Sequence, residues 1–565
     1  MKLSVGKYQN ELEMLCSYFH NEKVAERIWQ KDYTLWSDKP DEISNRLGWL
    51  NSPASSLKLL SEINEFVSSV QKDGFKKALL LGMGGSSLAP EVFRLTFGVK
   101  EDYLDLAVLD STDPASVKYF ENNFPVEETL FIVSTKSGGT VETFSFMKYF
   151  YNQTLKKVGK EKVGNHFVAI TDPNSGLETT AKELNFRKIF LNDPNIGGRY
   201  SALSLFGIVP AALIGVDVKN ILQLAEAFSF TTKLNNCNDN VSAKLGLIIG
   251  LLAKNKIDKL TFINSKKLSY FGAWVEQLIA ESTGKIGKGI LPVVGEDILE
   301  PKQYSNDRVF VHFHLKNEND LNEKINALTN EGFPVIDISI DDYNEIGSEF
   351  FKWEFATIVA SWVIKIQPFD QPNVESAKVV ARKMVQEYKE TGKLSELPIS
   401  CEENGIKITS NFQSSSVRDQ IQNFLSQLEK QNQDIPLPYV AIQAYVQMNK
   451  NNEELLQKIR TAIQQKYKIA TTLGFGPRFL HSTGQLHKGD AGNGLFIQFI
   501  YDPEIDLPIP DEAGNDKSSI SFGVLIKSQA LGDRQALLDN NRKLITINLG
   551  KDIQSSLEKI FDCVK

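Results

Sequence analysis

Short apolar segments alternate with longer amphipathic segments from about residue 75 onward. The apolar segments are residues 76–83, 105–110, 128–134, 166–171 and 187–191. They are apolar on both faces, which is typical of strands in a parallel sheet that helices cover on both sides. The pattern therefore predicts an α/β domain built from repeated strand–helix units.

The same alternation returns in a second stretch of the chain. Apolar segments at residues 255–265, 308–315 and 333–340 lead to a helix predicted around residues 350–367. Residues 207–230 lie between the two runs and are interpreted as a helical linker that packs against both. We therefore expect two doubly wound, parallel-sheet domains of similar construction.

A third section follows the turn-forming residues at 394–410. It contains a predicted helix at residues 452–467 and predicted strands near residues 494–502, 520–528 and 543–550. This mixture favours a smaller C-terminal α+β domain. The whole chain is of the α/β class.

These patterns divide the chain into four units. They are an N-terminal helical segment at residues 1–60, a first α/β domain at 61–235, a second at 236–395 and the C-terminal domain at 396–565. A chain of 565 residues is long enough for several hydrophobic cores.

Composition excludes several classes of protein. Apolar residues make up 42% and charged residues 24% of the chain, and a net charge of −7 leaves no large basic field for nucleic acid. The four cysteines are far apart in sequence, without the spacing of a zinc site or a disulfide framework. No apolar run approaches the roughly 18 residues of a membrane span, and no export signal is evident. We expect a cytoplasmic protein without a membrane or nucleic-acid partner.

Two glycine-rich turns carry the first chemical information. "LLLGMGGSSLAPEVF" (residues 80–94) runs from a strand through glycines into a helix, a geometry that aims backbone N–H groups at an anion. It fails the dinucleotide pattern because Ser87 stands where the third glycine is needed, and it lacks the lysine of a P-loop. An ordinary strand–helix turn remains the alternative for this segment.

The second turn is more informative. "FIVSTKSGGTVET" (residues 131–143) places hydroxyl groups, a lysine and backbone amides at a predicted helix N-terminus. This set suits a phosphate monoester, and the alternative is a serine-rich capping loop. Two such turns after successive strands predict a crevice for a small phosphorylated molecule at a topological switch point.

Five motifs in order resemble the sugar-isomerase (SIS) fold as used by the glucose-6-phosphate isomerase family. They are GMGGSSLAP, STKSGGTVET, GGRYSALS, EQLIAESTGKIGKG and FDQPNVESAK, and they span about residues 80–380. The resemblance implies two SIS-type domains and is greatest to the isomerase module that some bacteria carry fused behind a transaldolase. No transaldolase barrel precedes the motifs here.

The resemblance also implies a set of substrate contacts. Together with the two turns, it assigns substrate binding to Gly85, Ser86, Ser134, Thr135, Lys136, Ser137, Thr140, Gly198, Gln277 and Gln371.

Glu281 and Arg199 are the candidate groups for the central chemical step. Moving a carbonyl between C1 and C2 of a sugar phosphate needs a base that carries a proton between the two carbons through an enediolate. Glu281 lies in the apolar, small-residue segment "LIAESTG", and it resembles the proton-transferring glutamate of the family. Arg199 resembles the arginine that stabilises the enediolate oxygen. The alternatives are a surface glutamate and a structural ion pair.

Lys378 is the third catalytic candidate. It follows Gln371 by seven residues on a helix predicted to begin after Pro372, so both side chains can face one cleft. In the resembling family, the matching glutamine and lysine contact the sugar phosphate, with the lysine near the ring oxygen. A solvated lysine on a helix surface is the alternative.

The histidine that opens the sugar ring is where the chain departs from the family. The interval between Glu281 and Lys378 offers only His312 and His314, which lie in the predicted strand "VFVHFHL", opposite its apolar face. "HSTGQLHKG" supplies His481 and His487 instead, but on the far side of Lys378.

Three explanations of "HSTGQLHKG" stay open. A C-terminal loop folds over the cleft and His481 replaces the missing residue, His481 acts across a homodimer interface, or the string is a coincidence. We take His481 as the fourth catalytic candidate and leave open whether His487 fills that role.

The sequence thus predicts an aldose–ketose isomerase of glucose 6-phosphate and fructose 6-phosphate, with a hexose 6-phosphate as its small-molecule substrate. A non-catalytic SIS-fold sugar-phosphate sensor is the rival class, because a sensor needs the phosphate turns but not Glu281, Arg199 and Lys378. A mannose or amino-sugar phosphate isomerase is the rival within enzymes. The chemistry requires no cofactor, and no ligand spacing indicates a metal.

Overall fold

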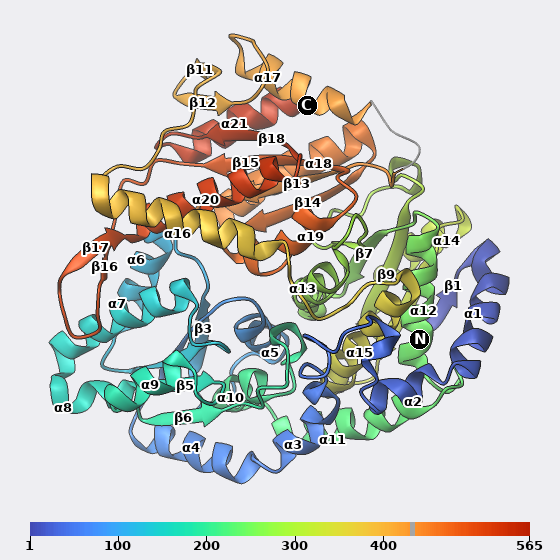
Figure 1. The fold of residues 1–565 in the computed structure, drawn as a ribbon, viewed down its shortest axis with the longest axis horizontal. Coiled ribbons are helices and arrows are strands. Elements are labelled where there is room, and N and C mark those ends of the chain that lie inside the picture. Colours follow the sequence, from blue (N-terminus) through green and yellow to red (C-terminus); the bar gives the residue numbers. More distant parts are fainter. Residues whose placement is uncertain (430–434) are drawn as a thin grey trace.

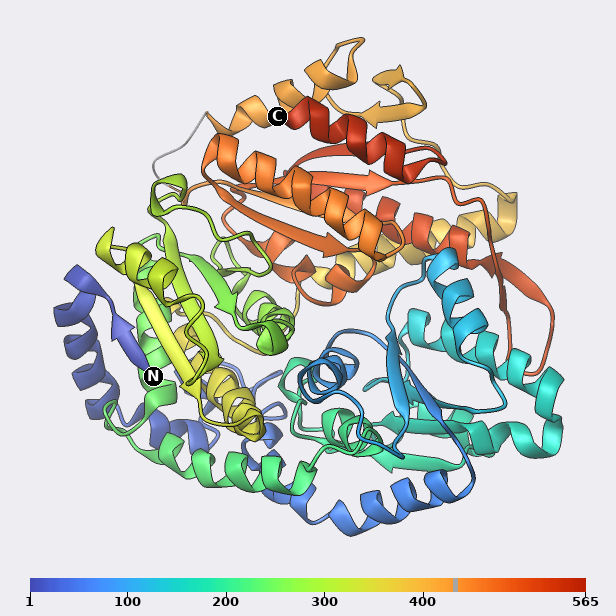
Figure 2. The same cartoon turned by 180° about the vertical axis from the view of Figure 1, so that it is seen from behind.

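The computed structural model describes residues 1–429 and 435–565. Three β-sheets, each flanked by helices, form three lobes around a common centre (Figure 1). Figure 2 shows the same three lobes from behind, with the C-terminal lobe again set against the other two. This confirms the α/β class with parallel sheets.

The first sheet is entirely parallel and doubly wound. Its order is β3-β2-β4-β5-β6. The strands span Lys77–Gly82 (β2), Asp105–Leu109 (β3), Thr129–Ser134 (β4), Phe167–Thr171 (β5) and Lys188–Leu191 (β6). The order reverses between β2 and β4, so both glycine-rich turns lie at the switch point, where ligands of such sheets bind.

The second sheet has the order β1-β10-β9-β7-β8. Its parallel strands span Lys259–Asn264 (β7), Leu291–Val293 (β8), Arg308–Leu315 (β9) and Val335–Ile340 (β10). An antiparallel edge strand, β1 (Lys2–Ser4), comes from the N-terminal segment that we predicted to be helical. The remainder of that segment does contain the helices α1 (Gln9–Asn21), α2 (Val24–Trp29) and α3 (Ser52–Leu57).

One hydrophobic core joins these two sheets. It includes β-strand residues from both sheets and the helices α12 (Val241–Lys254) and α15 (Ile346–Ile364), which pack against each other. Gly246 on α12 allows this packing, because a Cβ there would lie 2.3 Å from the Ala356 carbonyl oxygen. The first two lobes are therefore held as one unit.

The C-terminal sheet has the order β11-β12-β18-β15-β13-β14. Its four parallel strands are β13 (Tyr439–Ala444), β14 (Ala470–Phe475), β15 (Gly494–Ile500) and β18 (Lys543–Asn548). The strands β11 (Cys401–Glu403), at the edge, and β12 (Ile406–Thr409), beside it, are antiparallel. The C-terminal domain is thus a third, mostly parallel sheet with six strands, one more than either other sheet has.

Residues 520–528, which we predicted to be a strand, were assigned wrongly. Helix α20 (Phe522–Asp539) begins there, and the Ser521 side chain caps it by accepting a hydrogen bond from the Val524 N–H. Helices buried on most sides carry continuous apolar runs, so the local pattern resembles that of a buried strand.

Helix α16 (Val374–Thr391) connects the second sheet to the C-terminal lobe and packs along α20. Figure 1 shows α16 crossing between the C-terminal lobe and the first lobe. The antiparallel pair β16 (Pro508–Pro510) and β17 (Ser518–Ser521) reaches over α7 (Val141–Val158) of the first lobe. The C-terminal lobe therefore contacts the first lobe through its own hairpin. The exact division of the chain into four units stays a prediction.

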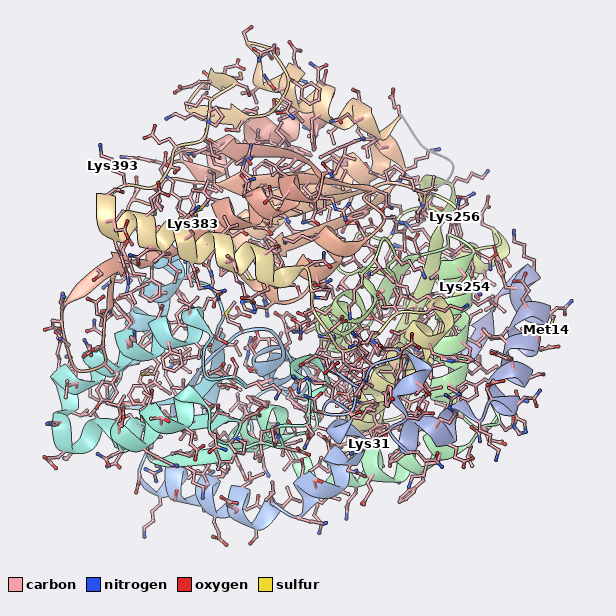
Figure 3. The ribbon with its side chains drawn as sticks, in the orientation of Figure 1. Met14, Lys31, Lys254, Lys256, Lys383 and Lys393 are labelled. Carbon is pink, nitrogen blue, oxygen red and sulfur yellow. The ribbon has the colours of Figure 1, made fainter. Side chains whose placement is uncertain are left out.

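The periphery is polar. Lys383 and Lys393, on and just beyond α16, and Lys31 of the N-terminal segment are exposed and are labelled in Figure 3. Among residues 1–429 and 435–565, no helix combines the length and the apolar character needed to span a bilayer.

Candidate functional site

A cavity of about 470 Å³ lies where the first lobe, α16 and the C-terminal lobe meet. Ser137, Thr140, Lys378 and His481 line it, together with Glu142. The structure thus brings together residues more than 300 positions apart in the sequence. Four of the residues predicted for the site share this cavity.

The second glycine-rich turn forms one wall of the cavity. Ser137 is exposed and Thr140 is half-buried at the N-terminus of α7, and Thr140 Oγ1 lies 2.9 Å from Thr135 Oγ1. No side chain caps the first turn of α7, so its backbone N–H groups stay available for an anion. Gly138 has φ +63°, and a Cβ there would lie 2.5 Å from the Leu177 nitrogen. This turn therefore needs glycine to adopt its shape.

Lys136 and Ser134 do not line the cavity. The Lys136 ammonium group forms an ion pair with Asp172 and donates to the Pro194 carbonyl oxygen at 3.0 Å. Ser134 Oγ donates to the Ser86 carbonyl oxygen at 3.2 Å. Both side chains hold the turn in place from behind.

The first glycine-rich turn packs tightly against the glutamate and arginine motifs. A Cβ on Gly85 would lie 2.0 Å from the Gly198 carbonyl oxygen, and one on Gly84 would lie 2.8 Å from Gln277 Nε2. These glycines let the three segments approach one another closely. Gly85, Ser86 and Gly198 do not line the cavity itself.

Glu281 and Arg199 form a buried ion pair beside this turn. Arg199 Nη1 lies 3.2 Å from Glu281 Oε2, and the side chains are 2% and 5% exposed. Arg199 also donates to Ser282 Oγ at 2.9 Å and to the Pro368 carbonyl oxygen at 2.6 Å. These bonds fix the guanidinium group against the end of α13 (Phe271–Thr283), which carries Glu281.

Burial raises the pKa of Glu281 above its ordinary value, and the positive charge of Arg199 counteracts part of that rise. His481 and Lys378, which line the cavity, also act electrostatically on Glu281. Glu281 is therefore a dry carboxylate within electrostatic range of the cavity. A raised pKa makes its carboxylate a stronger base.

Gln277 lies one helical turn before Glu281 and contacts the histidine loop. Its Nε2 donates to the His481 carbonyl oxygen at 2.8 Å. Its Oε1 is buried and has no partner among the described residues. Gln277 therefore anchors the loop and keeps one acceptor free.

His481 comes from η12 (Arg478–His481) of the C-terminal lobe. Its Nε2 lies 3.0 Å from Glu142 Oε1. The same oxygen accepts from Gln529 Nε2 at 2.7 Å, and Thr112 donates to Gln529 Oε1 at 2.7 Å. Burial alone would raise the pKa of Glu142, but the charge and hydrogen bond of His481, together with a backbone hydrogen bond and the charge of Lys378, bring the pKa below its ordinary value. The imidazole is thus held by a carboxylate inside the cavity of its own chain.

His487 lies elsewhere. It is buried in the C-terminal lobe, where its Nδ1 lies 3.4 Å from Gln443 Nε2 and its ring stacks on Tyr439 and meets Phe496 edge to face. Burial lowers the pKa of its imidazole well below the ordinary value. His487 does not line the cavity, so His481 is the better candidate for opening the sugar ring.

Lys378 and Gln371 are separated as well. Lys378 projects from the first turns of α16 and lines the cavity. Gln371 precedes α16, is exposed and does not line the cavity. The neighbouring Asn373 N–H donates instead to Gln485 Oε1 at 2.9 Å, which fastens the histidine loop to the start of α16.

Sequence reasoning missed Glu142 and Gln529. Glu142 stands two residues after Thr140 in the quoted motif, so its place at the start of α7 was available as a signal. Gln529 lies on α20, whose position over the first lobe is a tertiary feature. No set of three metal ligands lies around this cavity in the described parts of the chain.

Comparisons with known proteins identify the family that this chain resembles. Residues 58–289 match the family model described as phosphoglucose isomerase. A probable glucose-6-phosphate isomerase of Methanococcus maripaludis is 28% identical over 383 residues, covering 61% of this chain and 85% of the relative. The glucose-6-phosphate isomerase of Campylobacter jejuni is 27% identical over 388 residues, covering 61% of this chain and 94% of the relative.

Solved structures show the same fold. A hypothetical protein from Thermus thermophilus aligns with a TM-score of 0.57 at 21% identity, covering 68% of this chain and 99% of its own. A glucose-6-phosphate isomerase from Chlamydia trachomatis aligns with a TM-score of 0.51 at 20% identity, covering 65% and 78%. The predicted family resemblance is confirmed. The finer likeness to a transaldolase-fused module stays a prediction.

Proposed function

We propose that this chain is a glucose-6-phosphate isomerase, which interconverts glucose 6-phosphate and fructose 6-phosphate through an enediolate. The observation that carries the proposal is the buried Glu281–Arg199 pair. The pair does not itself line the cavity, but Glu281 interacts electrostatically with His481 and Lys378, which do line it together with the phosphate-type donors. A sensor would need the donors but neither the base nor the histidine. The family matches support the same activity.

The phosphate group binds at the N-terminus of α7. Ser137 and Thr140 offer hydroxyl groups beside uncapped backbone N–H groups, and the helix dipole favours an anion there. Lys136 stays paired with Asp172 and acts as a positioning residue for the turn. The phosphate thus fixes one end of the sugar in both directions of the reaction.

Ring opening falls to His481 and Lys378. Opening the pyranose moves a proton from O1 to O5, and His481 carries it while Glu142 stabilises the imidazolium. Lys378 lies near the ring oxygen by resemblance and lines the same cavity. In this assignment one chain supplies its own histidine, through the C-terminal lobe.

Proton transfer between the carbons falls to Glu281. Its carboxylate removes the proton from C2 of open-chain glucose 6-phosphate and returns it to C1, while the hydroxyl proton of O2 passes to O1, which yields fructose 6-phosphate. Arg199 stabilises the negative charge on the enediolate oxygen between the two steps. Gln277 and Gln371 remain proposed substrate contacts, the first through its free Oε1.

Location and assembly stay predictions. The cysteines, Cys16, Cys237, Cys401 and Cys563, are all free thiols, as in a reducing cytoplasm. A homodimer is compatible with the proposal but is no longer needed to supply His481.

A coupled assay tests the proposed function. Purified protein is mixed with fructose 6-phosphate and a chelator, and formation of glucose 6-phosphate is followed through an NADP-linked dehydrogenase. We expect turnover that the chelator does not abolish. Binding of fructose 6-phosphate without turnover would favour the sensor, and faster conversion of mannose 6-phosphate would favour a related isomerase.

A further inference from the structure

Three potential metal ligands converge on the second sheet, outside the sugar cavity. His312 and His314 lie on β9, two residues apart and on the same face, and Asp337 lies opposite His312 on β10. One ligand atom of each lies within 4.8 Å of those of the other two. Neighbouring strands of a sheet are rigidly spaced, so this arrangement is fixed by the backbone.

Both imidazole rings contact the same carboxylate oxygen. His312 Nδ1 lies 2.8 Å and His314 Nε2 lies 3.1 Å from Asp337 Oδ1. The two rings are stacked with their centroids 4.0 Å apart. Two basic nitrogens and one carboxylate therefore share a small volume.

The backbone contact of His314 determines which of its two ring nitrogens faces Asp337. His314 Nδ1 lies 2.8 Å from the Leu315 carbonyl oxygen, and a carbonyl oxygen can only accept, so Nδ1 carries the hydrogen. Nε2 is then the ring nitrogen that faces Asp337 Oδ1, at 3.1 Å, and it is in position to serve as a metal ligand. A backbone carbonyl that binds the second nitrogen is also the usual support of a metal-bound histidine.

We propose that His312, His314 and Asp337 bind a divalent transition-metal ion of the zinc type. Two imidazole nitrogens and one carboxylate oxygen form a donor set that zinc prefers over the harder magnesium and calcium ions. The side chains of His312 and His314 are only 3% and 9% exposed, whereas that of Asp337 is 27% exposed. Solvent reaches the site from the Asp337 side and fills the remaining coordination position.

The bound ion joins the carboxyl-terminal half of β9 to the amino-terminal half of β10. It is structural, because none of its three ligands lines the sugar cavity. The charged groups near Asp337 do not supply a fourth protein ligand to the metal ion. The amino group of Met1 acts electrostatically on Asp337, Glu349 and Lys352, and Lys352 is paired with Glu349. The site therefore has three protein ligands.

Metal titration of the full-length protein tests the proposal. Protein stripped with a chelator and dialysed into a buffer without phosphate is titrated with zinc chloride by calorimetry. We expect one saturable equivalent and a rise in the thermal unfolding midpoint, because an ion that binds only the native state stabilises it. His314→Ala and His312→Ala should each weaken binding by at least about tenfold.

Cys16 supplies the matched control. Its thiol lies near that of Cys237, which makes this pair the competing soft-donor site in the described chain. Cys16→Ser should bind zinc as the wild type does. Loss of zinc binding in Cys16→Ser with retention in both histidine variants would overturn the proposal.

A spectrum of the unmutated protein covers the case in which a histidine variant fails to fold. Cobalt bound by imidazole and carboxylate gives visible d–d bands without a thiolate charge-transfer band, and zinc should displace it. A thiolate band would overturn the proposal. Absence of saturable zinc and cobalt binding would also overturn it.

Discussion

Glu276 offers the sharpest quantitative test of how the C-terminal lobe docks on the site. It lies on α13, five residues before Glu281, and its Oε1 lies 3.5 Å from the hydroxyl group of Ser482, the neighbour of His481. A cavity of about 270 Å³ adjoins it, lined also by Arg460 and Arg478. The perturbation is Glu276→Gln, which keeps the shape and removes the charge.

The expected change in the free energy of unfolding follows from the pKa of Glu276. Burial raises the pKa of Glu276 from 4.5 to about 7, against the opposing charges of Arg460 and Arg478. Between those two values the native state binds the proton more tightly than the unfolded state does, so stability falls as the pH rises from 4.5 to 7 and is level above. A shift of two and a half units at 1.36 kcal/mol per unit gives about 3 kcal/mol.

Glu276→Gln should therefore be more stable than the wild type by about 3 kcal/mol at pH 8 and by less than about 1 kcal/mol at pH 5. Urea unfolding of both proteins at the two pH values measures this, with the slope of each transition checked for equality. Glu558→Gln, which removes an exposed carboxylate, is the control for net charge.

Two results would refute the reasoning. One is a Glu276→Gln variant no more stable than the wild type at pH 8. The other is a gain of equal size at pH 5 and pH 8, because a gain without pH dependence cannot come from the titration of Glu276.

Two further predictions concern the sugar cavity. Ser137→Ala and Thr140→Ala should each raise KM on the order of tenfold with little change in kcat, because the phosphate is bound equally in the ground and transition states. An unchanged KM in both variants would indicate that the phosphate binds at the turn around Ser86 instead. His481→Ala and Glu142→Gln should slow turnover of glucose 6-phosphate by a factor on the order of 10². They should spare erythrose 4-phosphate, which cannot form a pyranose, provided that the wild type accepts this sugar. Equal losses of activity on both sugars would assign the pair to folding or to closure of the cavity.

Local sequence was sufficient for all five strands of the first sheet and for β7, β9 and β10 of the second, but not for the edge strands β1 and β8. The predicted strand at residues 76–83 is β2 (Lys77–Gly82), and the one at residues 308–315 is β9 (Arg308–Leu315). Both are short apolar runs bounded by turn residues, and their environment inside a parallel sheet agrees with that pattern. The same logic failed at α20, where burial on most sides removed the helical periodicity.

The docking of the C-terminal lobe could not be predicted from local sequence. His481 reaches the cavity because Gln277 holds its carbonyl group and Gln485 fastens its loop to Gly284 and Asn373. These are contacts between segments that lie about 110 to 200 positions apart. The motif "HSTGQL" was visible, but its place was decided by packing between lobes.

Ion pairs with distant residues also place some side chains away from the site that their sequence motif predicted. Lys136 stands between hydroxyl residues in the sequence, yet Asp172 at the end of β5 draws its ammonium group away from the cavity. His312 and His314 were correctly placed on the polar face of a strand. Their carboxylate partner, Asp337, became apparent only from the order of strands in the sheet.

Hydrogen exchange at carbon tests the central claim most directly. Wild type and Glu281→Gln are incubated with fructose 6-phosphate in D₂O, and deuterium at C2 of the glucose 6-phosphate formed is measured by NMR. If Glu281 carries the proton through an enediolate, the wild type incorporates deuterium, and the variant loses turnover and incorporation together, on the order of 10² or more, while still binding the sugar phosphate. Incorporation by Glu281→Gln within tenfold of the wild-type rate would contradict the account.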